Sequence, residues 1–229
     1  MYRKGFTVIE LLVVISAITL LIAMLLPALG QARLSAQQAA CLSNVRQLEI
    51  AHWVYMTDHA SEMIGTSHGD SWIQTLREQY DPNLLLRSPL DISPHFEGGT
   101  PVNGKYRQTS YSLNLYLSED GVKHGIPSAT GTLDRVPRPA VTIHTGIGVF
   151  KGTAAVQDHF HPTQWQDPNP ALPPVFAAGE LQTNAHAGEL GKPDAVSAYG
   201  YLDGHAEALP FNATYVSVEQ NQYNPAVAR

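Results

Sequence analysis

The sequence predicts an α+β fold in which one long N-terminal α-helix packs on an antiparallel β-sheet. Residues 11–30 carry no charge. Apolar residues then continue at helical spacing, and from about residue 61 short strand-like runs alternate with turn-forming residues. We expect residues 6–27 to form a transmembrane segment, residues 28–60 to continue the same helix in amphipathic form, and residues 61–229 to form a globular, β-rich α+β domain.

Composition and charge limit the class of protein. The chain has 229 residues, of which 44% are apolar, enough for one compact domain and an additional element. With Arg3, Lys4 and Glu10 set aside, 12 of the 14 Lys and Arg and 19 of the 20 Asp and Glu remain, a net charge of −7 with histidine neutral. Because there is no basic stripe, we expect no nucleic acid partner.

The N-terminal apolar segment has the length of a membrane span. Residues 6–26 number 21 and would form a helix roughly 31 Å long, close to the thickness of the hydrocarbon core. Arg3 and Lys4 precede it and favour a cytoplasmic N-terminus. A secretory signal peptide has a shorter apolar core, although residues 28–30 loosely resemble its cleavage site. A buried core helix is disfavoured by so long a charge-free run, and an ordinary anchor leaves Glu10 without a role.

Glu10 is the informative residue of this segment. An isolated carboxylate at the edge of the hydrocarbon costs on the order of 2–3 kcal/mol, so it needs a partner. If the chain were cut after Gly5, the new amino group of Phe6 would lie one helical turn before Glu10. In a bundle of staggered identical helices, that amine could neutralise the carboxylate of a neighbouring subunit and so select the register of assembly.

Residues 5–15 read GFTVIELLVVI, which resembles the processing and methylation motif of type IV prepilins and type II secretion pseudopilins. The resemblance implies that residues 1–5 are a leader, that prepilin peptidase cuts after Gly5, and that it N-methylates Phe6. It further implies that Glu10 acts in assembly as the fifth mature residue. Pro27 falls where many pilins carry a helix-kinking proline.

The resemblance also implies a compartment and a set of partners. The chain would cross the inner (cytoplasmic) membrane once, with its C-terminal domain in the periplasm, and would then enter a periplasmic or surface fibre. Its partners would be prepilin peptidase, other pilin or pseudopilin subunits, the inner-membrane assembly platform and the lipid bilayer. No cofactor is implied.

The helix is expected to continue out of the membrane to about Met56. An apolar stripe at alternating steps of four and three residues predicts one buried face, with Arg33, Arg46 and Glu49 placed off it. The stripe consists of Leu34, Gln38, Cys41, Val45, Leu48, His52 and Tyr55.

Cys41 is the only cysteine, so no intramolecular disulfide is possible, and we expect a small apolar residue on a helix face. Residues 41–48 read CLSNVRQL and resemble a sub-group of pilin-like proteins with large C-terminal domains. Members of that sub-group often pair an early cysteine with a later Cys-Pro. This chain has Ser88 followed by Pro89 where that pair would stand, which implies that the bridge has been lost.

The globular part is expected to contain a short helix and several strands. The helix is predicted over residues 72–80, and Asp203 with Gly204 predicts a type I′ hairpin turn. The strand-like runs are residues 109–117, 141–150, 174–178, 197–209 and 214–218.

A second feature resembles the same sub-group, whose C-terminal signature is a histidine, a spacer of about nine residues, and Asp-Gly. Here His186 precedes Asp203 and Gly204 by a spacer of 16 residues. His186 is equivalent only if a loop has lengthened. We assign this signature no chemical role.

The ten histidines raise the question of a metal. Asp158, His159 and His161 could form a site with His186, Asp203 and His205, but no spacing matches a metal-binding signature. The proline-rich residues 162–174 predict a surface loop, so we expect surface histidines. Loop calcium is a separate possibility at residues 119–121 or 167–169, although neither segment has the ligand alternation of an EF-hand.

The sequence offers little catalytic signal. It has no phosphate-binding Gly-Lys-Ser/Thr loop, and Asp and His residues alone are too common to define a catalytic triad, so we do not expect an enzyme. Trp53, Trp72 and Trp165 are expected to be core or rim aromatics.

The leading hypothesis is a structural subunit of a type IV pilus-like or type II secretion pseudopilus fibre. The alternative is a minor or tip subunit that uses the pilin-type helix to anchor an adhesin-like binding module for a carbohydrate or a surface, which the large exterior domain favours. A plainly anchored enzyme is the third possibility.

Overall fold

A computed structural model describes residues 7–66, 72–80 and 86–229. The predictions made for Gly5 and Phe6, and for the charges before them, therefore lie outside the described residues. The chain divides into two compact units, Met1–Ala39 and Ala40–Arg229.

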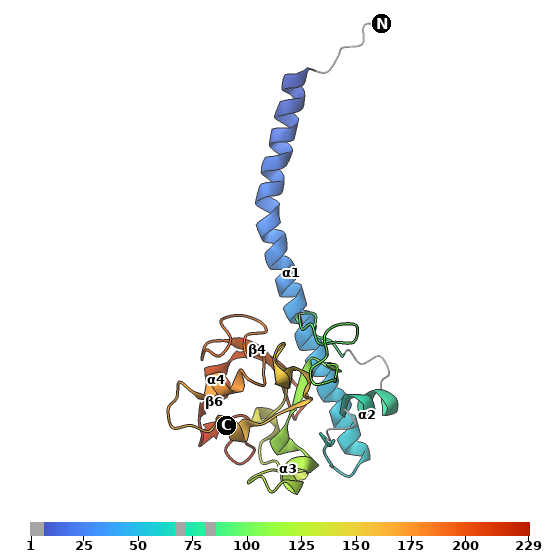
Figure 1. Ribbon diagram of the computed structural model, residues 1–229, viewed down its shortest axis with the longest axis vertical. Helices are drawn as coiled ribbons and strands as arrows, with labels where there is room; N and C mark the ends of the chain where they lie inside the picture. Colours follow the sequence, from blue (N-terminus) through green and yellow to red (C-terminus); the bar gives the residue numbers. More distant parts are fainter. Residues whose placement is uncertain (1–6, 67–71, 81–85) are drawn as a thin grey trace. The chain divides into compact units, whose positions relative to one another are not determined.

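The described part of the first unit is one helix. Helix α1 (Val8–Asp58) continues on both sides of Pro27 (Figure 1), and the kink expected at this proline stays a prediction. Helix α1 is long and apolar enough to cross a membrane, although a signal sequence near an N-terminus has the same properties. The most apolar part of α1 is not buried within the protein. The hydroxyl groups of Ser16 and Thr19 donate hydrogen bonds to the carbonyl oxygens of Leu12 and Ile15, at 2.7 and 2.8 Å. The helix therefore satisfies these two polar side chains itself.

The second unit begins within α1 and contains the sheet. Because α1 buries Cys41, Val45, Leu48 and His52, its last 19 residues belong to the globular unit, which starts earlier than residue 61. The remaining helices and strands are α2 (Trp72–Gln79), β1 (Tyr111–Asn114), α3 (Glu119–Lys123), β2 (Ile143–Ile147), β3 (His159–Phe160), α4 (Pro173–Ala177), β4 (Val196–Tyr201), β5 (Ala206–Pro210), α5 (Phe211–Thr214), β6 (Tyr215–Ser217) and β7 (Gln220–Asn221). Short 3₁₀ turns cover Leu115–Leu117, Leu133–Arg135, Pro139–Val141, Thr153–Val156 and Pro162–Trp165.

Five strands form one mixed sheet in the order β3-β1-β2-β4-β5, and β6 and β7 form a separate pair. Neighbours within β1, β2, β4 and β5 are antiparallel, whereas β3 pairs parallel with β1. The expectation of a purely antiparallel sheet is therefore wrong. It failed at β3, which is only two residues long and so too short to show an alternating pattern.

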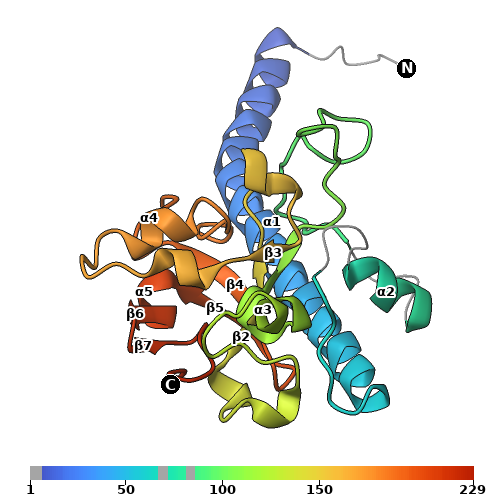
Figure 2. The same cartoon turned by 60° about the horizontal axis from the view of Figure 1, so that its bottom comes forward.

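Both faces of the sheet are covered. On one face, the part of α1 that follows Ala40 packs with α2 and the sheet around Leu48, Trp72 and Leu113. Figure 2 shows α2 on one side of this part of α1 and the sheet on the other. On the opposite face, the C-terminal elements α4, α5 and β6 gather around an aromatic cluster that includes Trp165 and Tyr223. Such double coverage explains why every residue of β1 and β2 is buried.

Several element predictions are confirmed. The short helix, the strands at residues 143–147 and 215–217, and the hairpin of β4 and β5 lie where the sequence placed them. Trp72 and Trp165 are core residues, and the partly exposed Trp53 lies at the rim.

Two local predictions are wrong. Of the predicted strand at residues 174–178, residues 174–177 are instead helical in α4, because consecutive prolines at Pro173 and Pro174 suit the first turn of a helix. The hairpin turn is not type I′, because only Gly204 has a positive φ, +93°. The Gly204 amide donates to the carbonyl oxygen of Tyr201 at 2.9 Å, so the loop is a three-residue turn of the bulged kind. The loop therefore consists of Leu202, Asp203 and Gly204. The buried Leu202 is its first residue, and a branched side chain disfavours the positive φ that a type I′ turn requires at its central residues.

Candidate functional site

The first candidate site is the start of helix α1. The backbone amide and hydroxyl of Thr7 donate to Glu10 Oε2 at 2.9 and 2.7 Å, and the amide of Glu10 donates to the Thr7 hydroxyl oxygen at 3.2 Å. This reciprocal arrangement is a capping box. Glu10 thus has a local role at the helix start that sequence reasoning missed, although the Thr-x-x-Glu spacing carries that signal.

Residues 8–29 of the first unit present apolar side chains on all sides. Between residues 8 and 29 the sequence has three polar side chains, Glu10, Ser16 and Thr19. The exposed large apolar residues in this stretch are Val8, Ile9, Leu11, Leu12, Val13, Val14, Ile15, Ile18, Leu20, Leu21, Ile22, Met24, Leu25, Leu26 and Leu29. A helix that is apolar all round is stable only where lipid or other apolar surfaces cover it.

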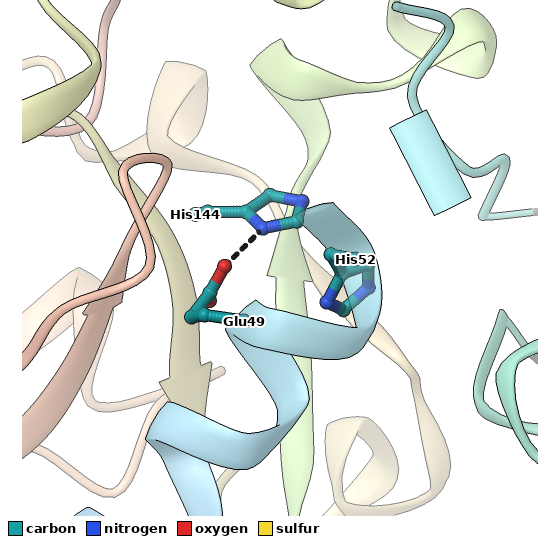
Figure 3. A group of neighbouring side chains, drawn as sticks. All are labelled: Glu49, His52 and His144. Carbon is teal, nitrogen blue, oxygen red and sulfur yellow. Dashed lines mark hydrogen bonds and ion pairs between the residues drawn. The ribbon is translucent and has the colours of Figure 1, made fainter. Parts of the chain in front are cut away.

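The second candidate site is a buried polar cluster between α1 and the sheet (Figure 3). Glu49, expected to lie off the buried stripe, is instead completely buried. Its Oε2 accepts a hydrogen bond from Nδ1 of His144 at 2.8 Å, and its Oε1 accepts one from the hydroxyl of Thr145. The prediction for Glu49 is wrong because these two partners, which lie far away in the sequence, replace water around the carboxylate.

His52 completes this cluster. It lies one helical turn after Glu49, and its ring centre is 4.5 Å from that of His144 in an edge-to-face arrangement. The Nδ1 of His52 bonds to the carbonyl oxygen of Leu48 at 2.9 Å. Burial holds the pKa of His52 well below its usual range, and the neighbouring His144 lowers it further, so His52 is neutral at pH 7.

The fold makes room for this cluster in two ways. Strand β2 pairs Ile143 with Tyr201 but Thr145 with Gly200, so His144 is an extra residue in a β-bulge. A bulge redirects side chains, which lets both His144 and Thr145 face Glu49. Gly200 supplies the space, since a β-carbon there would lie 2.8 Å from Cγ of Glu49.

The sequence carried a partial signal for this cluster. Glu49 and His52 have the Glu-x-x-His spacing that places two ligand-type side chains on one helix face. His144 could not be added from the sequence, because it joins through the bulge in β2. Within the described residues, Glu49, His52 and His144 form a group of side chains that lie close enough together to hold a metal ion.

Cys41 is buried and free, as expected. The hydroxyl of Ser88 lies 3.3 Å from its sulfur, so the structure brings together Cys41 and the residue that precedes Pro89. Burial raises the pKa of the Cys41 thiol to about 11, and the contact with Ser88 only partly offsets this effect. The thiol is therefore protonated and unreactive at neutral pH.

The structure does not bring His186 together with Asp203 and Gly204. The amide of His186 bonds to Val196, where β4 begins, whereas Asp203 follows Tyr201, where β4 ends. Strand β4 separates them by roughly 16 Å at the usual rise per residue. Asp203 instead accepts hydrogen bonds from the amide and ring of His205, at 3.1 and 2.5 Å, which stabilise the turn. Burial lowers the pKa of His186.

The expectation of surface histidines is wrong for His186, which is buried, and for His159, which is buried in β3. Its Nδ1 bonds to Asp158 at 2.8 Å, and Nδ1 of the partly buried His161 bonds to Glu180 at 2.5 Å. The two rings lie edge to face, 4.8 Å apart. Each imidazole is thus held by a different carboxylate, and within the described ranges no group of three possible metal ligands includes these histidines.

The two segments considered for calcium use their oxygens within the chain. Asp120 accepts from the amide of Thr66 at 2.6 Å, and Glu119 pairs with Lys123 at 3.0 Å. In the other segment Asp167 accepts from the amide of Asn169 at 2.8 Å, which makes an Asx turn. Turn and helix structure accounts for both segments.

In comparisons with known proteins, no family profile, no curated protein and no solved structure matches this chain.

Proposed function

We propose that this protein is a structural subunit of a type IV pilus-like or type II secretion pseudopilus fibre, processed after Gly5 and assembled through its N-terminal helix. The observation that carries the proposal is a helix exposed and apolar on all sides, with Glu10 as its one charged side chain in the span. Such a helix suits two apolar environments in succession, a lipid bilayer before assembly and a bundle of sister helices afterwards.

The energetics favour lateral association. Covering a large aliphatic side chain contributes about 1.5–3 kcal/mol, and fifteen such side chains are exposed between residues 8 and 29. Lipid supplies this cover in the membrane. A subunit that leaves the membrane keeps it only by packing against other apolar helices, which is what a fibre core provides.

The capping box is compatible with the proposed pairing between subunits. A carboxylate offers about four lone-pair positions, and the two Thr7 donors both use Oε2 of Glu10. Oε1 is then available to the amino group of Phe6 of a neighbouring subunit. The contact between Cys41 and Ser88 supports the sub-group resemblance, because a cysteine at residue 88 would be within reach of Cys41.

Two measurements test the proposal. Mass spectrometry of the mature protein is expected to find an N-methylated Phe6 as the first residue. An intact Met1, in cells that process other prepilins, would contradict both processing and assembly.

The role of Glu10 is tested by a pair of variants. Glu10→Gln keeps a capping box, because glutamine also serves at that position, but it removes the charge. Thr7→Val removes the capping hydroxyl and keeps the charge. We expect Glu10→Gln to enter the membrane but to fail to enter fibres, and Thr7→Val to be incorporated. Incorporation of Glu10→Gln at the wild-type level would show that Glu10 is only a cap.

A pilin-anchored binding module is the second candidate function. The second unit has a cleft of about 1400 Å³ whose described lining includes Arg77, Arg87, Phe96, Tyr106 and Arg107. Aromatic and arginine side chains together suit a carbohydrate or an acidic surface polymer. Isolated fibres that hold few copies of this chain, and that lose glycan binding with Tyr106→Ala, would favour this role over that of a repeating subunit.

A further inference from the structure

The buried cluster of Glu49, His52 and His144 contains two imidazole nitrogens without partners. Nε2 of His52 and Nε2 of His144 are both buried and make no hydrogen bond, and both side chains are about 1% exposed. Buried polar atoms are nearly always hydrogen-bonded. The orphaned Nε2 of His52 therefore indicates a missing partner in this cluster.

The partners of the two rings show which nitrogens an ion could use. The carbonyl oxygen of Leu48 can only accept, so Nδ1 of His52 donates to it. The neutral imidazole of His52 then has a lone pair on Nε2, the pattern of metal-binding histidines whose second nitrogen donates to a carbonyl or a carboxylate. In His144 it is Nδ1 that lies 2.8 Å from Oε2 of Glu49, so an ion that replaced the proton between them would be bound by this nitrogen and this oxygen together.

The backbone is also shaped for this cluster. Glu49 and His52 come from one turn of α1, His144 is delivered by the β-bulge, and Gly200 leaves the space that the Glu49 carboxylate fills. One ligand atom from each of the three residues lies within 4.8 Å of the others. Ligands of one Zn²⁺ ion, each about 2.0–2.2 Å from it, lie roughly 3–4 Å apart, so side-chain movements of about an ångström would close the site.

We propose that Glu49, His52 and His144 bind one divalent transition-metal ion of the zinc type in the core of the second unit. Two imidazole nitrogens and one carboxylate form a donor set that zinc uses in proteins, and imidazole suits Zn²⁺ better than it suits Ca²⁺ or Mg²⁺. The negative charge of the carboxylate reduces the net charge of the buried site. This inference is independent of the proposed role in a fibre.

The burial of the site assigns the ion a structural role. Because the three side chains are almost completely inaccessible, the ion would enter while the chain folds and would then link α1 to β2. Metal binding of this kind contributes directly to the free energy of folding. It would fix the globular unit to the helix that it shares with the first unit.

The test uses the full chain in detergent, produced without a histidine tag, unfolded with a chelator and refolded with one equivalent of Zn²⁺. We expect about one bound zinc per chain after desalting, a raised melting temperature, and a zinc-edge X-ray absorption spectrum with two imidazole ligands. We expect His52→Gln and His144→Gln to lower the zinc affinity at least tenfold. His124→Gln, at an exposed histidine, is the matched control and should bind as the wild type does.

Three results would overturn the proposal. The first is a refolded wild-type protein that holds no zinc and melts at the same temperature with and without it. The second is an absorption spectrum with fewer than two imidazoles, which needs no variant and so stands even if the substitutions prevent folding. The third is equal zinc binding by His144→Gln and His124→Gln, which would place the ion on surface histidines.

Discussion

The two units of this protein use apolar residues in opposite ways. In the first unit, side chains such as Leu20 and Leu25 are 60% and 65% exposed, and the hydrogen bonds described for the helix, including its capping box, are local. In the second unit, residues such as Leu48 and Leu113 are completely buried between α1, α2 and the sheet. The first unit is therefore completed by an apolar environment that it does not contain, whereas the second supplies its own.

The same contrast holds for polar groups. The carboxylate of Glu10 is exposed and bonds within one helical turn. The carboxylate of Glu49 is fully buried and bonds to residues about 95 positions later. A charge in the first unit is thus free to meet another molecule, while a charge in the second is committed to the fold.

The largest expected effect separates the two units by their cores. Leu113→Ala should destabilise the second unit by about 2–5 kcal/mol, because it opens a cavity in a packed core. Leu20→Ala should change the same unfolding transition by less than about 0.5 kcal/mol, because its side chain has no packing to lose. All three tryptophans follow residue 39, so denaturant unfolding followed by tryptophan fluorescence reports on the second unit alone. Equal losses for the two variants would contradict the division.

The fold was predictable where one element determines it. The limits of α1 and the buried positions Cys41, Val45, Leu48 and His52 follow from helical periodicity within one segment. The β4–β5 hairpin follows from Asp203 and Gly204, which mark a turn wherever they stand between strands. The parallel pairing of β3 with β1 was not predictable, since it depends on where a long connection returns.

The buried cluster shows why the rest of the site could not be read from the sequence. A charged residue on a helix is normally assigned to the exposed face, and Glu49 departs from this rule only because His144, Thr145 and Gly200 meet it from other strands. Its burial is a tertiary property. The sequence of the helix shows the Glu-x-x-His spacing but does not identify His144 as the partner of Glu49.

The next effect in size tests the geometry around Cys41. Ser88→Cys should form a disulfide with Cys41, since the present side-chain atoms are 3.3 Å apart. A bridge over this loop should stabilise the second unit by about 2–4 kcal/mol. Thiol titration and melting with and without a reductant measure both effects. Ser217→Cys, in β6, is the control and should leave two free thiols; a Ser88→Cys protein with two free thiols would show that this region is placed differently.

Two glycines extend the contrast to substitutions that add one methyl group. Gly200→Ala should cost about 1–3 kcal/mol, because the methyl group meets the buried Glu49 side chain. Gly30→Ala meets nothing within 4 Å and should favour the helix by up to about 1 kcal/mol. Fluorescence-detected unfolding measures the first and circular dichroism of the helix in detergent the second. A neutral Gly200→Ala would mean that Glu49 has room to move, which would also weaken the case for a defined ligand geometry.

The smallest expected effect concerns Glu180, a carboxylate held within the second unit. Burial alone would raise its pKa, but hydrogen bonds from the ring and amide of His161 and from the indole of Trp165 outweigh burial, so the pKa lies below its ordinary value of 4.5. A carboxyl group whose pKa is lowered by folding stabilises the folded state at pH values above its pKa in the unfolded chain. This contribution disappears as the pH falls through its pKa in the folded state.

Glu180→Gln should therefore cost about 1 kcal/mol at pH 7, and the difference in unfolding free energy from the wild type should shrink as the pH falls below about 4. Urea unfolding between pH 3 and 7 measures this difference, with Glu119→Gln, at an exposed residue paired with Lys123, as the control that should stay within about 0.5 kcal/mol of the wild type. A loss that does not change with pH would assign Glu180 a role in packing rather than in charge.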